Sequence, residues 1–242
     1  MQLVIDVGNT RIKAALFQQS ELKKQFIFGT TDELFSANLF EINTINNCIV
    51  ASVVNEMDVF VSQLKKKTNV LLFTSETSVP LKNNYESIQT LGSDRLASAV
   101  GGNSLFPNKN ILIIDAGTCI KYNFVNKLNE YIGGAISPGL EMRFKALSTF
   151  TARLPLVEKE ESFETVIGKN TRESILSGVE IGAVAEMEGI ISLYQQMYSD
   201  LIVVLTGGDV NFFEKRLKKP IFADQFLILK GLNVILDYTI NA

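Results

Sequence analysis

Two short stretches place an aspartate and glycines directly after an apolar strand. Residues 5–13 read IDVGNTRIK, and residues 114–121 read IDAGTCIK. Because Asp, Asn and Gly are disfavoured inside strands, both stretches predict a strand that ends in a tight turn. Hard cations prefer oxygen ligands, so a carboxylate that is repeated at the tip of a strand indicates cation binding. Asp6 and Asp115 are therefore candidate ligands of a metal ion.

The same two turns carry groups that suit phosphate. Glycine allows backbone N–H groups to approach a phosphate closely, and the hydroxyls of Thr10 and Thr118 can donate to its oxygens. Lys13 can neutralise phosphate charge. A tight hairpin with a structural Asp or Asn is the alternative for either turn alone. We expect further glycine-containing turns at 133–139 and 206–209, and the repetition favours a phosphate site.

A third candidate lies between the two turns, where residues 91–95 read LGSDR. A helix is predicted from residue 95 to 104, so Asp94 lies near a helix N-terminus, where negative charge is favourable. Arg95 offers a planar group of donors for a carboxylate or a phosphate. The alternative is a helix-capping Asp beside a surface Arg. The residues by themselves leave both interpretations open.

Composition excludes several kinds of chemistry. The 242 residues include no histidine, which excludes Ser-His-Asp and Cys-His catalysis and histidine metal sites. A general base must then be Asp, Glu, Lys, Tyr or Cys. The two cysteines, Cys48 and Cys119, lie far apart in the sequence without metal-ligand spacing, which suits a reducing compartment.

Charge and hydropathy predict a cytoplasmic protein with neither nucleic acid nor membrane as a partner. The net charge is −3 and the isoelectric point is about 5.2, so no global positive field attracts nucleic acid. The longest apolar runs, 111–114 and 201–205, are far shorter than the ~18 residues of a membrane span. Asp6 interrupts the first apolar stretch, so no signal peptide is expected.

Strand and helix signals alternate along the chain, in two halves that begin alike. Strands are predicted at 2–6, 12–17, 25–29, 46–54, 70–74, 108–125 (two strands and a turn) and 201–209. Helices are predicted at 58–67, 95–104, 140–150 and 171–198. Alignment of Asp6 with Asp115 also pairs Lys13 with Lys121 after a slip of one residue. We expect an α/β protein with an internal duplication, and with domains at 1–107 and 108–242.

The predicted helix 171–198 is longer than a small domain requires, since it would span ~40 Å. Its small residues permit close contact with another helix: Gly178, Gly182, Ala183, Ala185 and Gly189. Three glutamates interspersed among them argue against a membrane role. This helix is therefore expected to form a subunit interface.

The ordered set DVGNTRIK, LGSDR after Tyr85, DAGTC and GGAISPG resembles the type III pantothenate kinases. The segment NTRESILSG (170–178) extends the resemblance over essentially the whole chain, and no GxxxxGK[ST] or GxGxxG loop competes with it. The resemblance implies two duplicated ribonuclease-H-like domains of the actin-like ATPase superfamily, with ATP in the cleft between them. It also implies ATP-dependent phosphorylation of pantothenate to 4′-phosphopantothenate, the first step of coenzyme A biosynthesis.

The resemblance implies a role for each matched residue. ATP and its Mg²⁺ would be bound by residues of the two turns: Asp6, Gly8, Asn9, Thr10, Lys13 and Thr118. The pantothenate pocket would be lined by Tyr85, Gly92, Ser93, Asp94 and Arg95. Asp94 would accept the proton of the pantothenate hydroxyl, and Asp115 would bind a monovalent cation, K⁺ or NH₄⁺. In a homodimer, Thr171 from the other subunit would help to close the pocket.

Two positions depart from the family pattern, and other functions stay open. Ile88 stands where a proline is usual, and Cys119 replaces a more usual alanine with a side chain small enough to pack. The alternatives are an actin-like kinase for a sugar or acetate, a hydrolase of polyphosphate or nucleotides, and a non-catalytic regulatory protein accessory to transcription. The acidic isoelectric point disfavours DNA binding by the last of these.

Overall fold

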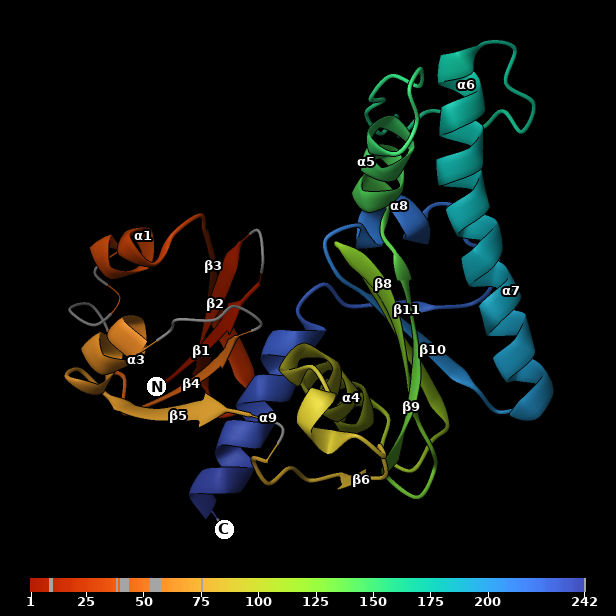
Figure 1. The fold of residues 1–242 in the computed structure, drawn as a ribbon. Coiled ribbons are helices and arrows are strands. Elements are labelled where there is room, and N and C mark those ends of the chain that lie inside the picture. Colours follow the sequence, from red (N-terminus) through yellow and green to blue (C-terminus); the bar gives the residue numbers. More distant parts are fainter. Residues whose placement is uncertain (9–10, 38, 40–43, 53–57, 75, 242) are drawn as a thin grey trace. The chain divides into compact units, whose positions relative to one another are not determined.

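The computed structural model describes residues 1–8, 11–37, 39, 44–52, 58–74 and 76–241 (Figure 1). The chain forms two compact units. Unit 1 comprises Met1–Asn108, Leu128–Ile132 and Phe226–Ala242, and unit 2 comprises Lys109–Lys127 and Gly133–Gln225. Spatial contacts thus group the C-terminal segment with the N-terminal half. The domain boundary at residue 107 was inferred from repetition in the sequence and stays a prediction.

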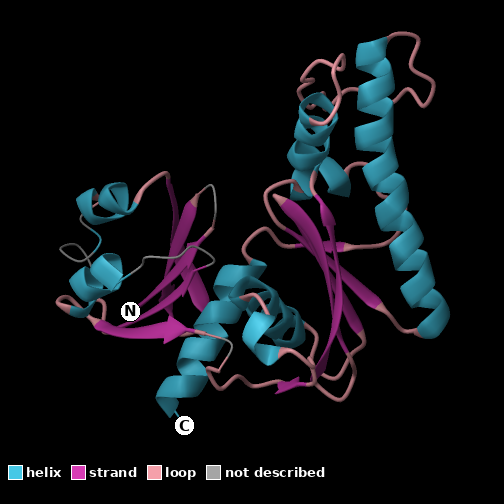
Figure 2. Ribbon diagram, viewed as in Figure 1, coloured by secondary structure: helices cyan, strands magenta, loops and turns pink. Residues whose placement is uncertain are grey.

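Unit 1 is built on a five-stranded mixed sheet of order β3-β2-β1-β4-β5 (Figure 2). Its strands are β1 (Gln2–Val7), β2 (Ile12–Gln18), β3 (Glu21–Phe28), β4 (Asn47–Ser52) and β5 (Asn69–Phe73). β1 pairs antiparallel with β2 and parallel with β4. The third strand was predicted to start at residue 25, but β3 already pairs with β2 at Glu21. Most side chains at the start of β3 are exposed, so no apolar pattern indicates a strand there.

The sheet of unit 2 repeats this topology. Its strands are β7 (Ile111–Ala116), β8 (Cys119–Val125), β9 (Glu130–Pro138), β10 (Ile202–Thr206) and β11 (Phe222–Ala223). Their order is β11-β10-β7-β8-β9, followed by the short β6 (Lys82–Asn83). β7 pairs antiparallel with β8 and parallel with β10, as β1 does with β2 and β4. The repeated strand order is what an internal duplication requires.

One predicted turn is wrong. Gly133 and Gly134 lie inside β9 rather than in a turn, and only Gly139 follows the end of that strand. A Cβ on Gly134 would lie 1.7 Å from the backbone oxygen of Tyr122 in β8, and its φ is +157°. The two glycines thus allow close approach between strands, a use that the sequence does not distinguish from a turn.

Two helices of unit 1, α4 (Ser93–Leu105) and α9 (Leu227–Asn241), pack backbone against backbone. The other helical elements of this unit are α1 (Thr31–Ser36), α3 (Asp58–Lys65) and the 3₁₀ turn η1 (Ile88–Thr90). A Cβ on Gly231 of α9 would lie 1.9 Å from the oxygen of Ala97, and one on Gly101 of α4 would lie 2.5 Å from the oxygen of Leu227. These glycines therefore hold α4 close to α9, and α4 carries Asp94.

Unit 2 contains a long helix that is interrupted by a π turn. Its helices are α5 (Leu140–Thr149), α6 (Thr171–Leu176), the π turn η2 (Ser177–Ile181), α7 (Gly182–Met197) and α8 (Val210–Glu214). The helix predicted at 171–198 is confirmed as α6, η2 and α7 in succession. The residue types at 177–181 are compatible with a regular helical turn, so the sequence gives no indication of the π turn. Within the described ranges, every helix is too short or too polar to span a bilayer.

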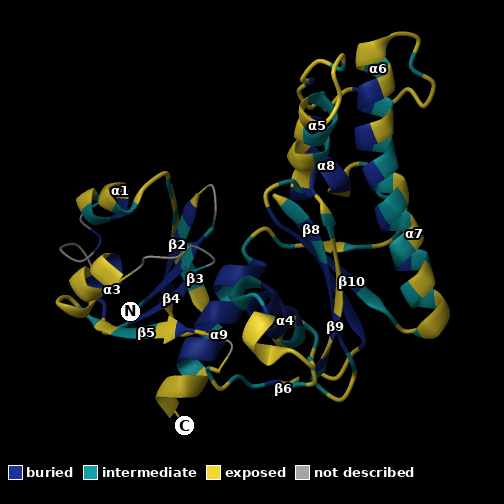
Figure 3. Ribbon diagram, in the orientation of Figure 1, coloured by how far each residue is buried: buried dark blue, intermediate teal, exposed yellow. Residues whose placement is uncertain are grey.

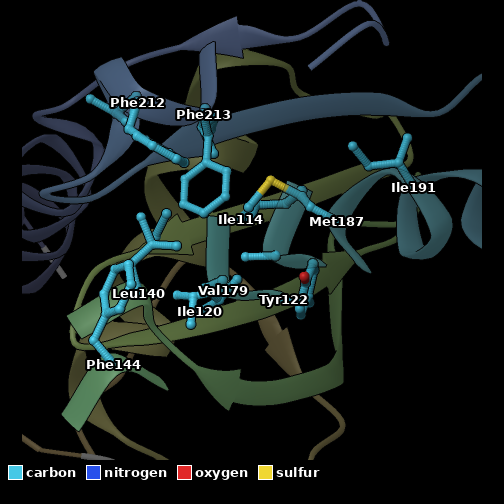
Figure 4. Close-up of a cluster of buried hydrophobic side chains, with 14 of the residues drawn as sticks. Ile114, Ile120, Tyr122, Leu140, Phe144, Val179, Met187, Ile191, Phe212 and Phe213 are labelled. Carbon is cyan, nitrogen blue, oxygen red and sulfur yellow. The ribbon is translucent and has the colours of Figure 1, made fainter. Parts of the chain in front are cut away.

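The cores of the two units consist mainly of strand residues and the inner faces of these helices (Figure 3). In unit 2, Ile114, Ile120 and Tyr122 from the sheet pack with Met187 and Ile191 of α7 (Figure 4). The same cluster includes aromatic residues of α5 and α8. Strand β7 is buried along its whole length, so Asp115 near its end lies in a largely apolar environment.

Candidate functional site

In unit 1, two parallel strands end and helix α4 begins at one edge of the sheet. Val7, next to Asp6, pairs with Ser52 at the end of β4. The Ser93 hydroxyl donates to the backbone oxygen of Ser52 at 3.4 Å, which brings the N-terminus of α4 to the same edge. Asp6 and Asp94, both half-buried, therefore lie at the same edge of the first sheet.

Helix α4 starts two residues earlier than predicted, which places Asp94 inside its first turn. Asp94 Oδ1 accepts a hydrogen bond from the backbone N–H of Arg95 at 2.8 Å. A Cβ on Gly92 would lie 2.7 Å from that same oxygen, so the glycine leaves room for the carboxylate. The helix N-terminus favours the charged form of Asp94.

The alternative of a surface arginine is wrong, because Arg95 is only 6% exposed. Its Nη1 lies 3.4 Å from the Tyr85 hydroxyl, and its guanidinium carbon lies 5.4 Å from the centre of the Tyr85 ring. The ring of Tyr85 in turn contacts that of Tyr131, with centroids 6.0 Å apart. Tyr85 and Arg95 are ten residues apart in the chain, and they meet because the loop before α4 folds back onto the first turn of that helix.

The loop between Tyr85 and α4 is ordered without the proline that is usual at Ile88. The Thr90 hydroxyl donates to the backbone oxygen of Ser87 at 3.0 Å and lies 2.8 Å from the Ser87 hydroxyl. The backbone N–H of Leu91 donates to the oxygen of Ile88 at 3.1 Å. These bonds close the turn η1, so local hydrogen bonds do here what a proline ring would do through φ.

The turn after β1 lies beside a lysine. Lys13 of β2 stands opposite Asp6 in the antiparallel register, and the N–H of Gly8 donates to the oxygen of Arg11 at 3.1 Å. Asn9 and Thr10, which were predicted to bind ATP, lie outside the described residues. The described part of the turn therefore presents one carboxylate and one ammonium group on neighbouring strands.

The turn after β7 repeats this arrangement with one residue fewer. Lys121 stands opposite Asp115, as Lys13 stands opposite Asp6. The first turn has residues 8–11 between its last paired residues, whereas the second has residues 117–119. The slip of one residue in the sequence alignment is therefore absorbed in the turn, and the two lysines are equivalent in the fold.

Asp115 forms an ion pair at the end of β7. It is 6% exposed, and its Oδ2 lies 2.9 Å from Nζ of Lys121. In the parallel register Asp115 pairs with Thr206 of β10. Among the described residues no group of three or more acidic, cysteine or histidine side chains could hold a metal ion. A cation at Asp115 would therefore need backbone carbonyl or water oxygens as further ligands, which suits a weakly bound hard ion.

Three backbone turns meet beside this ion pair. The N–H of Gly139 donates to the oxygen of Thr118 at 3.0 Å, and the N–H of Asp209 donates to that of Ala116 at 2.9 Å. Gly207 has a φ of +104°, and a Cβ there would lie 2.2 Å from the oxygen of Ala116. Thr118 itself is exposed. Strand β7, the start of α5 and the turn after β10 thus present backbone groups at one edge of the second sheet.

A glutamate of α7 fixes the segment before Gly139. Glu186 accepts hydrogen bonds from Ser137 at 2.6 Å and from Arg143 at 2.5 Å, and Arg143 also donates to the oxygen of Pro138 at 2.8 Å. Burial by itself raises the pKa of Glu186, but these hydrogen bonds outweigh burial and hold the pKa below its usual range. Glu186 is therefore ionised at neutral pH and holds the turn in place.

A cavity of about 350 Å³ opens next to these turns. Its apolar wall includes Leu140, Phe144, Leu156 and Val157. Its charged wall includes Lys159 and Asp209, whose Nζ and Oδ1 atoms are 3.1 Å apart. Glu141, Lys145 and Glu158 also line the cavity, so its lining is a mixture of apolar and charged side chains. Lys159 could not be identified from the sequence, because its partner Asp209 lies 50 residues away.

Thr171 begins α6 in unit 2 and is exposed, whereas Tyr85, Asp94 and Arg95 belong to unit 1. The preceding Asn170 accepts a hydrogen bond from the N–H of Glu173 at 2.9 Å and donates to the Glu173 carboxylate at 2.8 Å. This reciprocal capping arrangement fixes the start of the helix and hence the position of Thr171.

A family model and individual relatives of the chain all indicate the same protein family. A family model described as type III pantothenate kinase matches residues 2–193. A type III pantothenate kinase of Bacteroides fragilis is 45% identical over 243 residues, which cover 98% of each chain. One from Flavobacterium johnsoniae is 42% identical over 244 residues, which cover 100% of this chain and 99% of the relative.

Solved structures show the fold. A Baf family transcriptional activator from Campylobacter jejuni superposes with a TM-score of 0.66 at 20% identity, covering 99% of this chain and 100% of that one. A ROK family glucokinase from Streptomyces griseus does so with a TM-score of 0.56 at 11% identity, covering 100% and 99%. Together with the repeated sheets, these likenesses confirm the predicted actin-like α/β fold.

Adjacent glycines in the turn after β10 provide a first prediction. Gly207→Ala is expected to destabilise the protein by about 2 kcal/mol or more, because its φ is positive and the added Cβ meets a backbone oxygen. The midpoint of thermal unfolding should fall by about 4–8 °C. Gly208→Ala is the matched control, since no atom lies within 4 Å of its Cβ and its φ is not positive. Equal unfolding midpoints for the two variants would contradict the close approach.

Proposed function

Because the chain belongs to the type III pantothenate kinase family, we propose that Asp94 is the general base of its phosphoryl transfer. The chain is a pantothenate kinase, an enzyme of coenzyme A biosynthesis with ATP and pantothenate as substrates. In the proposed reaction, the primary hydroxyl of pantothenate attacks the γ-phosphate of ATP. The observation that carries the proposal is the position of Asp94 in the first turn of α4, at the sheet edge that also carries Asp6.

Positioning and charge account for most of the catalysis in phosphoryl transfer. The hydrogen bond from Arg95 N–H to Oδ1 orients the Asp94 carboxylate, and the helix N-terminus stabilises its charge. Asp94 would orient the attacking hydroxyl and accept its proton as the bond to phosphorus forms. The resulting 4′-phosphopantothenate and ADP then leave the site.

Arg95 and Tyr85 are proposed to bind pantothenate. A guanidinium held beside a tyrosine ring is a rigid partner for a carboxylate, which pantothenate carries. Gly92 and Ser93 would complete the pocket, because they form the helix start on which Asp94 stands. The contact with Tyr85 supports this role, because it holds the guanidinium in one direction.

ATP would be held by both phosphate turns. Mg²⁺ bound with ATP would neutralise phosphate charge, and Asp6 would hold it directly or through water. Gly8 and Lys13 would contact the phosphates from the first turn, with Asn9 and Thr10 assigned by family resemblance alone. Thr118 would contact ATP from the second turn. The exposed hydroxyl of Thr118 beside closely spaced backbone groups supports this assignment.

Asp115 is proposed to bind a monovalent cation, K⁺ or NH₄⁺. Lys121, which stands opposite Asp115 on β8, already supplies one positive charge at Oδ2 of Asp115. A singly charged ion coordinated also by backbone oxygens would add little repulsion to that pair. The positive charge of Lys121 therefore favours a monovalent cation over a divalent one, because a divalent ion would be repelled more strongly.

A homodimer is proposed in which α6 and α7 contact a second copy of the chain. Large apolar side chains are exposed on or near these helices: Val166, Ile167, Leu193 and Met197. Val166 and Ile167 precede α6, and Leu193 and Met197 lie in the last turns of α7, so exposed apolar groups occur at both ends of the long helix. In this arrangement Thr171 of one subunit would help to close the pantothenate pocket of the other.

Asp94→Asn should abolish most of the turnover while leaving the fold intact. The amide keeps an oxygen that can accept from Arg95 N–H, but it cannot take up a proton. We expect kcat to fall by about 10² to 10⁴ with the KM for ATP unchanged, in an assay of ADP release with pantothenate. Asp32→Asn is the matched control, because Asp32 is an exposed first-turn aspartate of α1. A near-normal kcat for Asp94→Asn would exclude Asp94 as the base.

The same assay separates the alternative functions. Release of phosphate from ATP without any acceptor would favour a hydrolase. ADP release with a sugar or acetate, but not with pantothenate, would favour another kinase of this fold.

Asp115→Asn should weaken activation by K⁺. The substitution removes the negative charge that attracts the cation but keeps the size of the side chain. Activity is measured against K⁺ concentration at constant ionic strength, and the half-activating concentration should rise by about tenfold or more. Asp200→Asn serves as the control, since Asp200 is an exposed carboxylate hydrogen-bonded to Asn110 in the same unit. Unchanged cation activation in Asp115→Asn would remove Asp115 as a ligand.

A mixing experiment tests whether Thr171 acts across a homodimer. Thr171→Glu places a negative charge against the anionic substrate, yet an acidic residue is favourable in the first turn of α6. Neither Thr171→Glu nor Asp94→Asn should be active alone. Subunits of the two variants, unfolded and refolded together, should regain about a quarter of the wild-type rate, because half of the dimers are mixed and each has one intact site. No recovery would contradict a shared site.

A further inference from the structure

A buried charged pair in unit 2 has no part in the reaction as described so far. Glu180 lies in the π turn η2, and its side chain is 0% exposed. Arg216 follows α8 and its side chain is 13% exposed. The Nη2 atom of Arg216 lies 3.8 Å from Oε2 of Glu180. Burial raises the pKa of Glu180, so the carboxylate is held in an environment unfavourable to its charge.

Both members of the pair hold the backbone of the segment that precedes α6. Glu180 Oε1 accepts from the N–H of Glu160 at 2.7 Å. Arg216 Nη2 donates to the oxygen of Glu161 at 2.6 Å and lies 3.4 Å from that of Phe163. The guanidinium carbon of Arg216 also lies 3.9 Å from the centre of the Phe212 ring, which fixes its direction.

The segment 160–170, here named the strap, is also bound to α6. The Glu160 carboxylate forms an ion pair with Arg172 at 2.5 Å. The N–H of Lys169 donates to the Glu173 carboxylate at 2.8 Å, and the Ser177 hydroxyl donates to the oxygen of Val166. The strap is thus held at its start by the buried pair and farther along by residues of α6 and η2, and Thr171 follows it directly.

A buried ion pair is weak evidence for stability, because the loss of hydration can exceed the attraction between the charges. Apolar residues of similar size often replace such a pair at no cost. A π turn is likewise less favourable than a regular helical turn and is frequent at functional sites. Glu180 belongs both to the buried ion pair and to the π turn. This combination favours a role in positioning the strap rather than a role in stability alone.

We propose that Glu180 and Arg216 are positioning residues that fix the strap and thereby set the place of Thr171 for pantothenate binding. The proposal rests on the role of Thr171 in closing the pantothenate pocket. Neither Glu180 nor Arg216 is expected to contact the substrate. The pair acts through the backbone of residues 160–163 and the Glu160–Arg172 ion pair.

The test compares Glu180→Gln with wild type by steady-state kinetics on the full chain. The amide can still accept from Glu160 N–H, but the attraction to Arg216 is lost. We expect the KM for pantothenate to rise about fivefold or more, with kcat and the KM for ATP within about twofold. Glu164→Gln is the matched control, because Glu164 is an exposed residue of the same strap. Its kinetic constants should equal those of wild type.

A second variant guards against misfolding. Glu180→Gln combined with Arg216→Met leaves no unpaired buried charge, and it should show the same selective rise in the KM for pantothenate. An unchanged KM in both variants would overturn the proposal. The proposal would also be overturned if kcat fell, the KM values for both substrates rose equally and the midpoint of thermal unfolding was lower. That result would indicate a structural role for the pair. Wild-type protein that fails to phosphorylate pantothenate would instead refute the proposed function itself.

Discussion

The backbone at the end of β7 is approached from two sides more closely than a side chain would permit. Gly139 contacts Thr118, and Gly207 contacts Ala116, each at a distance that excludes a Cβ. The hydrogen bonds of Gly139 and Asp209 then link the start of α5 and the turn after β10 to the same strand end. Because these contacts are between backbones, the place of Thr118 and Asp115 follows from strand register and not from flexible side chains.

The two units use one topology for different tasks. In both, an aspartate ends the central strand and a lysine stands opposite it on the next strand. Unit 1 adds α4, which brings Asp94 and Arg95 to its edge, whereas unit 2 adds a buried ion pair at Asp115 and a cavity beside Asp209. The two strand ends are thus equivalent in topology, and the elements around them make them chemically distinct.

Much of the fold was predictable because its signals are local. The strand–Asp–Gly turns, the start of α4 near Asp94 and the long helix from Thr171 depend on residues close together in the chain. The mistakes have local causes as well. Gly133 and Gly134 suit a turn and a close strand approach equally, and the interior of the helix gave no sign of its π turn.

The sequence by itself determined the repeated turns, the family resemblance and the residues that could carry phosphoryl transfer. Only the tertiary structure decided that Arg95 is buried against Tyr85, that Lys159 pairs with Asp209, and that Glu180 faces Arg216. Those partners meet through helix packing and sheet register. Their contacts depend on residues distant in the chain, and no local pattern of residue types specifies which distant groups will be adjacent after folding.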